Sequence, residues 1–230
     1  MAAEEDSLTN HSVVEAAVDT MQMVVAPARQ SFAEPASEEQ IARAVQALTA
    51  NNIRAIVVDD RAAALRALLE VLPEGAEVFT ASSQTLEAMG ALKAINESGR
   101  FDAIRPKLLK LDRQTQGREM RKLAGSPDYV VGSVHAITEQ GQVLVASGGG
   151  SQLASYVYGA GKVVWVAGTQ KIVADLNEGF RRIDEHSLPL EDARMRQTRG
   201  VGSLVGKVLI FNREPAGRTT LILVREALGY

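Results

Sequence analysis

The chain has 230 residues, of which 46% are hydrophobic and 23% are charged, and its formal net charge is −3. A chain of this length can bury a sizeable core, and its slight acidity with dispersed Lys and Arg predicts no binding to nucleic acid. The lack of cysteine excludes disulfides, thiolate zinc sites, cysteine-bound iron–sulfur clusters and a catalytic Cys, and three scattered histidines predict no metal site, so we expect neither a metal nor a cofactor.

The amino-terminal residues 1–37 are predicted to be an extension of a domain that spans residues 38–230. Residues 13–25 have the pattern of a short amphipathic helix, and the stretch that follows contains two prolines, as is typical of a linker. The first residues are acidic and polar, without the basic and apolar segments of a secretion signal. No apolar run approaches the roughly 20 residues that cross a bilayer, so we expect a cytoplasmic protein that makes no contact with a membrane.

Helices and strands are predicted to alternate from Ser37 onward. Ser37 and Gln40 fit a capping box, which predicts the start of a helix with one apolar face. The pattern then predicts a strand over 53–58, a helix over 61–72, a short strand at Val78 and Phe79, and a helix after the polar loop 80–83.

The second half of the chain continues this alternation. It contains a predicted helix around 114–124, two strands over 129–147 broken at Gln140-Gly141, a strand over 163–167, a helix capped by Asp175, and closing strands over 207–211 and 219–224. In the helix after Asp175, the inward-facing residues are predicted to be Leu176, Phe180 and Ile183.

Short apolar strands that alternate with helices predict an α/β fold around a mainly parallel sheet. The strands that precede the two small polar loops are part of this alternation. We therefore expect Val78, Val145 and Val164 to lie in one sheet.

Three consecutive glycines, Gly148, Gly149 and Gly150, lie between an apolar strand and a helix-like segment. Ordering three glycines costs much backbone entropy, which indicates unusual dihedral angles or close approach by a neighbour. Bare N–H groups and the hydroxyl of Ser151 at a helix start suit a phosphate or a carboxylate. The spacing fits neither a Walker loop nor a dinucleotide fingerprint, and a tightly packed turn explains the glycines equally well.

A weaker version of the same signal occurs in "TASSQT". The hydroxyls of Ser82, Ser83 and Thr85 can donate to an anion, although Ser and Thr are also ordinary helix N-caps. Ligands of open α/β sheets bind beyond the carboxyl ends of the strands, where both loops are predicted to lie. The two loops together therefore predict a composite anion site at one edge of the sheet.

Three further residues are candidates for chemistry. Glu139 ends a strand and has the residue type of a general base or nucleophile, and His135 would share its face of a regular strand. Lys171, just beyond the strand over 163–167, is positioned to neutralise a phosphate. A solvated turn residue, a packed histidine and a surface lysine are the commoner explanations of such positions.

The segment "DYVVGSVHAITEQGQVLVASGGGSQLASYVYGAGKVVWVAGTQKIVADLNEGFRRI" resembles the LUD domain family, which includes the lactate-utilisation proteins. The stretches "ASSQTLEAMG" and "GRTTLILVREALGY" are also similar to that family, so the resemblance covers residues 38–230. It implies a Rossmann-like, mainly parallel sheet with helices on both faces, as in ribose-5-phosphate isomerase, glucosamine-6-phosphate deaminase and CoA transferases.

The resemblance also implies which residues bind a ligand, because this fold group holds phosphorylated sugars or CoA thioesters in the loops after the strands. The acidic position of the family's "AIAETG" pattern corresponds to Glu139, which makes it the candidate catalytic residue. The matching ligand-binding positions are Ser82, Ser83 and Thr85 in the first loop and Gly148, Gly149, Gly150, Ser151 and Gln152 in the second, with Lys171 beside them.

Two departures from the family pattern bear on function. The family's cysteine cluster is replaced by "MRQTRGVGSLVGKVLIF", and the Asp of its "GAD" pattern is replaced in "GSVHAI". The resemblance therefore implies an accessory or ligand-binding subunit that works with iron–sulfur partner subunits in the oxidation of L-lactate to pyruvate. The alternative is a stand-alone enzyme or a sensor for a small anionic ligand such as a phosphorylated sugar or acyl-CoA. The number of subunits stays open, a homo-oligomer included.

Overall fold

The computed structural model describes residues 25–230. The helix predicted over 13–25 therefore lies outside the described residues, apart from its last residue. The stretch predicted as a linker packs on the body of the domain. It contains the short helix η1 (Gln30–Ala33), whose Phe32 is buried, and the backbone N–H of Arg29 donates to the carbonyl of Glu185 at 2.7 Å.

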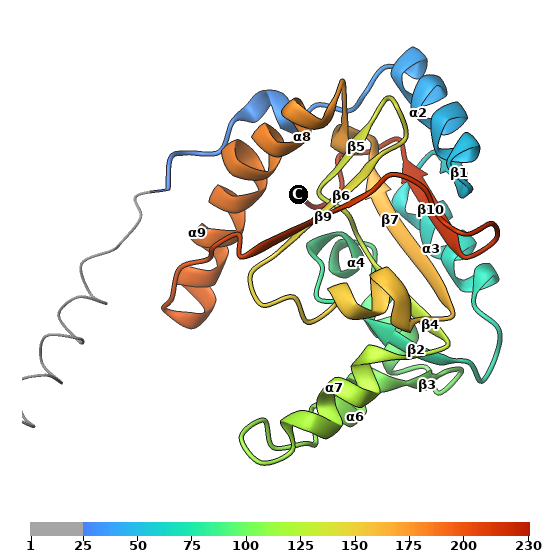
Figure 1. The fold of residues 1–230 in the computed structure, drawn as a ribbon, viewed down its shortest axis with the longest axis vertical. Coiled ribbons are helices and arrows are strands. Elements are labelled where there is room, and N and C mark those ends of the chain that lie inside the picture. Colours follow the sequence, from blue (N-terminus) through green and yellow to red (C-terminus); the bar gives the residue numbers. More distant parts are fainter. Residues whose placement is uncertain (1–24) are drawn as a thin grey trace, which may run out of the picture.

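The centre of the fold is a six-stranded sheet in which every neighbouring pair is parallel (Figure 1). This confirms the prediction of an α/β fold around a mainly parallel sheet. In spatial order its strands are β1 (Ile53–Val58), β10 (Thr219–Val224), β7 (Lys162–Gly168), β4 (Tyr129–Gly132), β2 (Glu77–Thr80) and β3 (Asp102–Ala103).

Both faces of this sheet are covered, and the alternating side chains of β7 show how. Val164 and Val166 pack into the cluster that contains the helices α3 (Arg61–Val71), α4 (Gln84–Ala88) and α5 (Ala91–Asn96). Val163 and Trp165 pack into the opposite cluster, with helix α2 (Glu38–Ala50). Helix α2 starts with the predicted capping box, because the Ser37 side chain accepts from the backbone of Gln40 and the Gln40 side chain accepts from the backbone of Ser37.

A second, four-stranded sheet lies on the α2 side and was not predicted. Its order is β8 (Ile172–Val173), β5 (Ala136–Thr138), β6 (Val143–Ser147) and β9 (Lys207–Phe211). Val145 belongs to β6, so the prediction that it shares a sheet with Val78 and Val164 was wrong. The strand β6 is buried along 143–146 just as a strand of a parallel sheet is, and hydrophobic pattern alone does not separate the two cases.

The remaining helices position the functional site. Helix α8 (Leu176–Arg182), the π-helical turn η4 (Ile183–Ser187) and α9 (Leu188–Arg199) follow one another without a break and run beside the second sheet, at the left of Figure 1. The other helical segments are α6 (Ile104–Leu108), α7 (Gly117–Gly125), η2 (Ser155–Gly159) and η3 (Thr169–Lys171). Within residues 25–230, no helix combines the length and apolar character needed to span a bilayer.

Helix α8 differs from its prediction in the face that it buries. Gly179 and Ile183 are buried, but Phe180 is 39% exposed although it was expected to face inward. Gly179 packs so closely on Leu144 of β6 that an added Cβ would lie 3.0 Å from a Leu144 methyl group. The small residue, and not the phenylalanine, therefore forms the contact of this helix with the second sheet.

Candidate functional site

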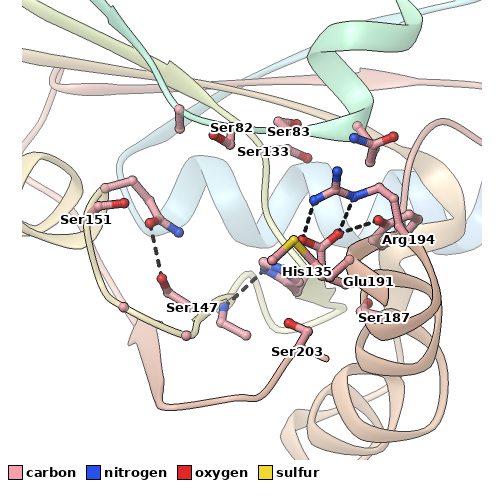
Figure 2. A pocket seen from close by; sticks show the side chains of 18 of the residues that line it. Ser82, Ser83, Ser133, His135, Ser147, Ser151, Ser187, Glu191, Arg194 and Ser203 are labelled. Atoms are coloured by element: carbon pink, nitrogen blue, oxygen red, sulfur yellow. Dashed lines mark hydrogen bonds and ion pairs between the residues drawn. The ribbon is translucent and has the colours of Figure 1, made fainter. Parts of the chain in front are cut away.

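A cavity of about 480 Å³ opens beyond the carboxyl ends of β2 and β4. Figure 2 shows Ser82, Ser83 and Ser133 on one side of it, Ser147 and Ser151 on another, and Glu191 and Arg194 of α9 facing them. The open end of a parallel sheet is where ligands of α/β folds bind. The cavity is therefore the candidate functional site.

Both predicted loops reach this one cavity, although the strands that precede them belong to different sheets. Ser82 and Ser83 line it from the first loop. The second loop contributes Gly148, Gly149, Ser151 and Gln152. The loops converge because the carboxyl end of β6 in the second sheet and the carboxyl end of β2 in the first face the same space.

The three glycines of the second loop have different structural roles. Gly150 has a φ of +86°, and its N–H donates to the Ser147 hydroxyl at 2.9 Å, so that amide is already paired. An added Cβ at Gly149 would meet no atom within 4 Å, so packing does not explain this glycine. The chain then enters a short helical segment that continues into the five-residue π-helical turn η2, so few aligned peptide dipoles stand behind the predicted anion site.

Thr85 and Lys171 do not line the cavity but lie buried behind its wall, with exposures of 1% and 0%. The ammonium nitrogen of Lys171 donates to Ser133 Oγ and to the Val134 carbonyl, both at 3.0 Å, and these two residues line the cavity. Thr85 Oγ1 and the main-chain oxygen of Tyr230, the last residue of the chain, complete its acceptors at 3.1 Å. Burial and the nearby Arg182 guanidinium lower the pKa of Lys171.

Arg182 is a second fully buried cation at the same wall. Its guanidinium donates to the carbonyl of His135 and to Ser187 Oγ, two residues that line the cavity. Burial lowers its pKa to about 9. Among residues 25–230, no Asp or Glu side chain lies within ion-pair distance of Lys171 or Arg182, whose partners are main-chain and hydroxyl oxygens.

His135 lines the cavity between β4 and β5, in front of these two cations. Its Nδ1 accepts the backbone N–H of Ala146 at 3.1 Å (Figure 2). Burial, then Lys171, then Arg182 lower the pKa of His135 to about 3. The imidazole is therefore neutral at physiological pH.

The low pKa of His135 predicts a loss of stability in mild acid. The unfolded chain takes up a proton at His135 as pH falls below 6.5, whereas the folded chain resists this until about pH 3. The stability is fully present above pH 6.5 and declines below it, by about 2 kcal/mol at pH 5 from this one group. Urea unfolding of the wild type and His135→Gln at a series of pH values measures this, and parallel curves for the two proteins would contradict it.

The rim of the cavity carries further charges that the sequence did not reveal as a group. Arg105 of α6 donates to the Thr80 carbonyl at 3.0 Å and to Ser82 Oγ at 2.9 Å, and burial followed by repulsion from Arg199 lowers its pKa. Among the residues that the structure describes, neither Arg105 nor Arg199 forms an ion pair with a carboxylate. The first loop is thus held by a cation whose charge is not neutralised.

A second group at the rim consists of Glu191, Arg194 and Tyr230, which bond to one another. Glu191 accepts two hydrogen bonds from Arg194, both at 2.7 Å, and a third from the Tyr230 hydroxyl at 2.5 Å. Burial opposes ionisation of Glu191, but the bonds from Arg194 and Tyr230 outweigh it and lower its pKa. Burial and the bond to Glu191 raise the pKa of Tyr230. The carboxylate of Glu191 is therefore already hydrogen-bonded and is not available as a general base.

Glu139 is not among the residues that line the cavity. It lies just after β5, where it pairs with Arg43 of α2 at 2.6 Å, and the hydrogen bond from Arg43 lowers its pKa. It shares no regular strand with His135, because β5 covers only Ala136–Thr138, with His135 directly before it and Glu139 directly after it. The composite site that the structure forms therefore contains His135 but not Glu139.

Comparison with known proteins agrees with this fold. The sequence matches the LUD domain family over residues 41–207. The chain belongs to the LUD domain family. A crystal structure of a DUF162 family protein from Deinococcus radiodurans is similar to this LUD protein, with a TM-score of 0.52 and 14% sequence identity over 83% of this chain and 99% of that one. No curated protein matched the sequence.

Proposed function

We propose that this LUD-domain protein binds a small anionic metabolite, with a phosphate or carboxylate group, in the cavity between the 80–85 and 147–152 loops. The observation that carries the proposal is the pair of fully buried cations, Lys171 and Arg182, behind the cavity wall. Like charges repel strongly in a low-dielectric interior, and an anion in the cavity would offset that cost.

The wall itself supplies donors suited to an anion. Ser82, Ser83 and Ser151 offer hydroxyls, and Gly149 exposes backbone where no side chain stands between it and the cavity. Arg105 adds a cation beside Ser82. Hydrogen bonds to an ionised acceptor are roughly twice as strong as neutral ones, so several such donors give useful affinity.

For the biological role, we propose a cytoplasmic accessory or ligand-binding subunit in the oxidation of L-lactate to pyruvate. Membership of the LUD family supports this role. The chain has no cysteine to hold an iron–sulfur cluster, so the proposal assigns the redox centre to iron–sulfur partner subunits. Stable co-purification with iron–sulfur proteins from the native host grown on lactate supports the role, and isolation without them counts against it.

Calorimetric titration with inorganic phosphate, L-lactate and pyruvate tests the binding proposal. We expect at least one of these anions to bind the wild type and to bind Arg105→Ala about tenfold more weakly, since one charge-assisted hydrogen-bonding group is lost. Glu139→Gln is the matched control, because Glu139 lies outside the cavity. Failure of all three anions to bind, or equal weakening by Glu139→Gln, would contradict the proposal.

The size of the cavity favours a second candidate ligand. Its volume of about 480 Å³ falls within the range of about 300–1,000 Å³ that is typical of sites for drug-sized ligands, and it exceeds the needs of a three-carbon acid. A phosphorylated sugar or an acyl-CoA-type ligand, bound by a stand-alone enzyme or a sensor, fits this volume better. Ribose 5-phosphate and acetyl-CoA in the same titrations separate the two candidates.

A further inference from the structure

The ring of His135 is oriented from several sides. Its backbone N–H donates to the Leu144 carbonyl at 2.9 Å, and its own carbonyl accepts from the Arg182 guanidinium. Its Nδ1 accepts the backbone N–H of Ala146 at 3.1 Å. The hairpin of β5 and β6 and helix α8 therefore fix both the backbone and the side chain.

The bond from Ala146 determines which ring nitrogen carries the proton. A nitrogen that accepts an N–H has no hydrogen of its own, so the neutral ring of His135 carries its proton on Nε2. An imidazolium would turn a second N–H toward the Ala146 N–H, which is a repulsive arrangement. Lys171 of η3 and Arg182 of α8, the charged groups packed behind the ring, oppose a positive charge there as well.

The Nε2 atom is available to a ligand. It makes no hydrogen bond with any of residues 25–230. It is also accessible, because the fully buried side-chain N and O atoms without a partner in this part of the chain do not include it. Since His135 lines the cavity and its Nε2 is neither bonded nor fully buried, we infer that Nε2 faces the open space. A donor held in place before the ligand arrives costs little entropy on binding.

We propose that His135 is a fixed, neutral hydrogen-bond donor that holds an oxygen of the bound anion through Nε2–H and takes no proton from it. This inference rests on the proposed function and specifies the ligand group as a carboxylate, phosphate or carbonyl oxygen. It also excludes His135 as a general base. Any acid–base step in the cavity would have to use another group.

The protonation state is tested by nitrogen-15 NMR of the histidine rings, with His135→Gln to assign the signal. We expect the His135 ring to show a protonated Nε2 and a bare Nδ1 at every point between about pH 5.5 and 8, with or without ligand. A ring protonated on Nδ1, or one that titrates in this range, would overturn the inference. This measurement needs no ligand and so does not depend on the proposed function.

The ligand contact is tested by a matched pair of variants. His135→Asn keeps an acceptor near the position of Nδ1 for the Ala146 N–H but has no atom at the position of Nε2, whereas His135→Gln returns an N–H close to that position. We expect His135→Asn to bind inorganic phosphate about ten- to a hundredfold more weakly at an unchanged melting temperature, and His135→Gln to recover part of the loss.

Wild-type affinity in a folded His135→Asn protein would overturn the contact. Failure of the wild type to bind inorganic phosphate, L-lactate and pyruvate would instead overturn the proposed function, and the contact with it. The NMR result would still decide the protonation state.

Discussion

Replacing Gly141 with alanine is expected to lower the free energy of unfolding by about 2–5 kcal/mol. Gly141 has a φ of +77°, which costs an L-residue about 1–2 kcal/mol. An added Cβ would also lie 2.5 Å from the carbonyl carbon of Ala47 and 2.7 Å from the backbone nitrogen of Leu48. These are backbone atoms of α2 that cannot turn away, and forcing atoms into a packed site costs about 1–3 kcal/mol more.

Gly75→Ala is the matched control for this change. Gly75 has nearly the same φ, +75°, but an added Cβ there would meet nothing within 4 Å. Its expected cost is the conformational part alone, about 1–2 kcal/mol. Urea denaturation of both variants separates the cost of the backbone conformation from the cost of the steric clash with α2. Equal losses of unfolding free energy in the two variants would show that the turn after β5 does not pack tightly against α2.

The second large effect concerns the glycine loop. Gly149→Val is expected to abolish anion binding while the protein stays folded. Gly149 lines the cavity, its φ is not positive, and its Cβ direction is open, so the valine side chain would occupy ligand space at little cost to the fold. Ser151→Ala should weaken binding by only about 0.5–1.5 kcal/mol, the usual net value of one hydrogen bond.

Gly125→Val provides the control for this loop. Gly125 ends α7 outside the cavity, and its Cβ direction is also free of neighbours within 4 Å. Thermal melts paired with phosphate titrations should show that both valine variants are folded and that only Gly149→Val has lost binding. If Gly149→Val melted early yet still bound phosphate, the glycines would serve packing and not the ligand.

Local signals in the sequence predicted most of the helices and the central sheet. The capping box at Ser37 and Gln40 and the apolar strand around Trp165 depend on near neighbours in the chain, and both have the expected structure. The break between β4 and β5 did not follow from pattern, because both strands are apolar and short. The second sheet follows from this break, whereas Glu139 lies at the opposite end of β5 from His135 and pairs there with Arg43.

The candidate site was harder to predict because its charges come from distant parts of the chain. Lys171 and Arg182 have residue types that are almost always exposed, and nothing near them in sequence marks them as buried. Arg105 reaches Ser82 across 23 residues, a contact that only the folded chain creates. The loops themselves were visible in the sequence because glycine and serine clusters mark positions where the backbone is exposed or turns sharply.

The central claim is that the cavity holds an anion in front of two buried cations. Crystals soaked in selenate, a tetrahedral anion that is located by its anomalous scattering, test it most directly. We predict a selenium peak inside the cavity, with an anion oxygen about 3 Å from His135 Nε2. Selenate bound only at the outer surface, with the cavity empty at full soaking concentration, would contradict the claim.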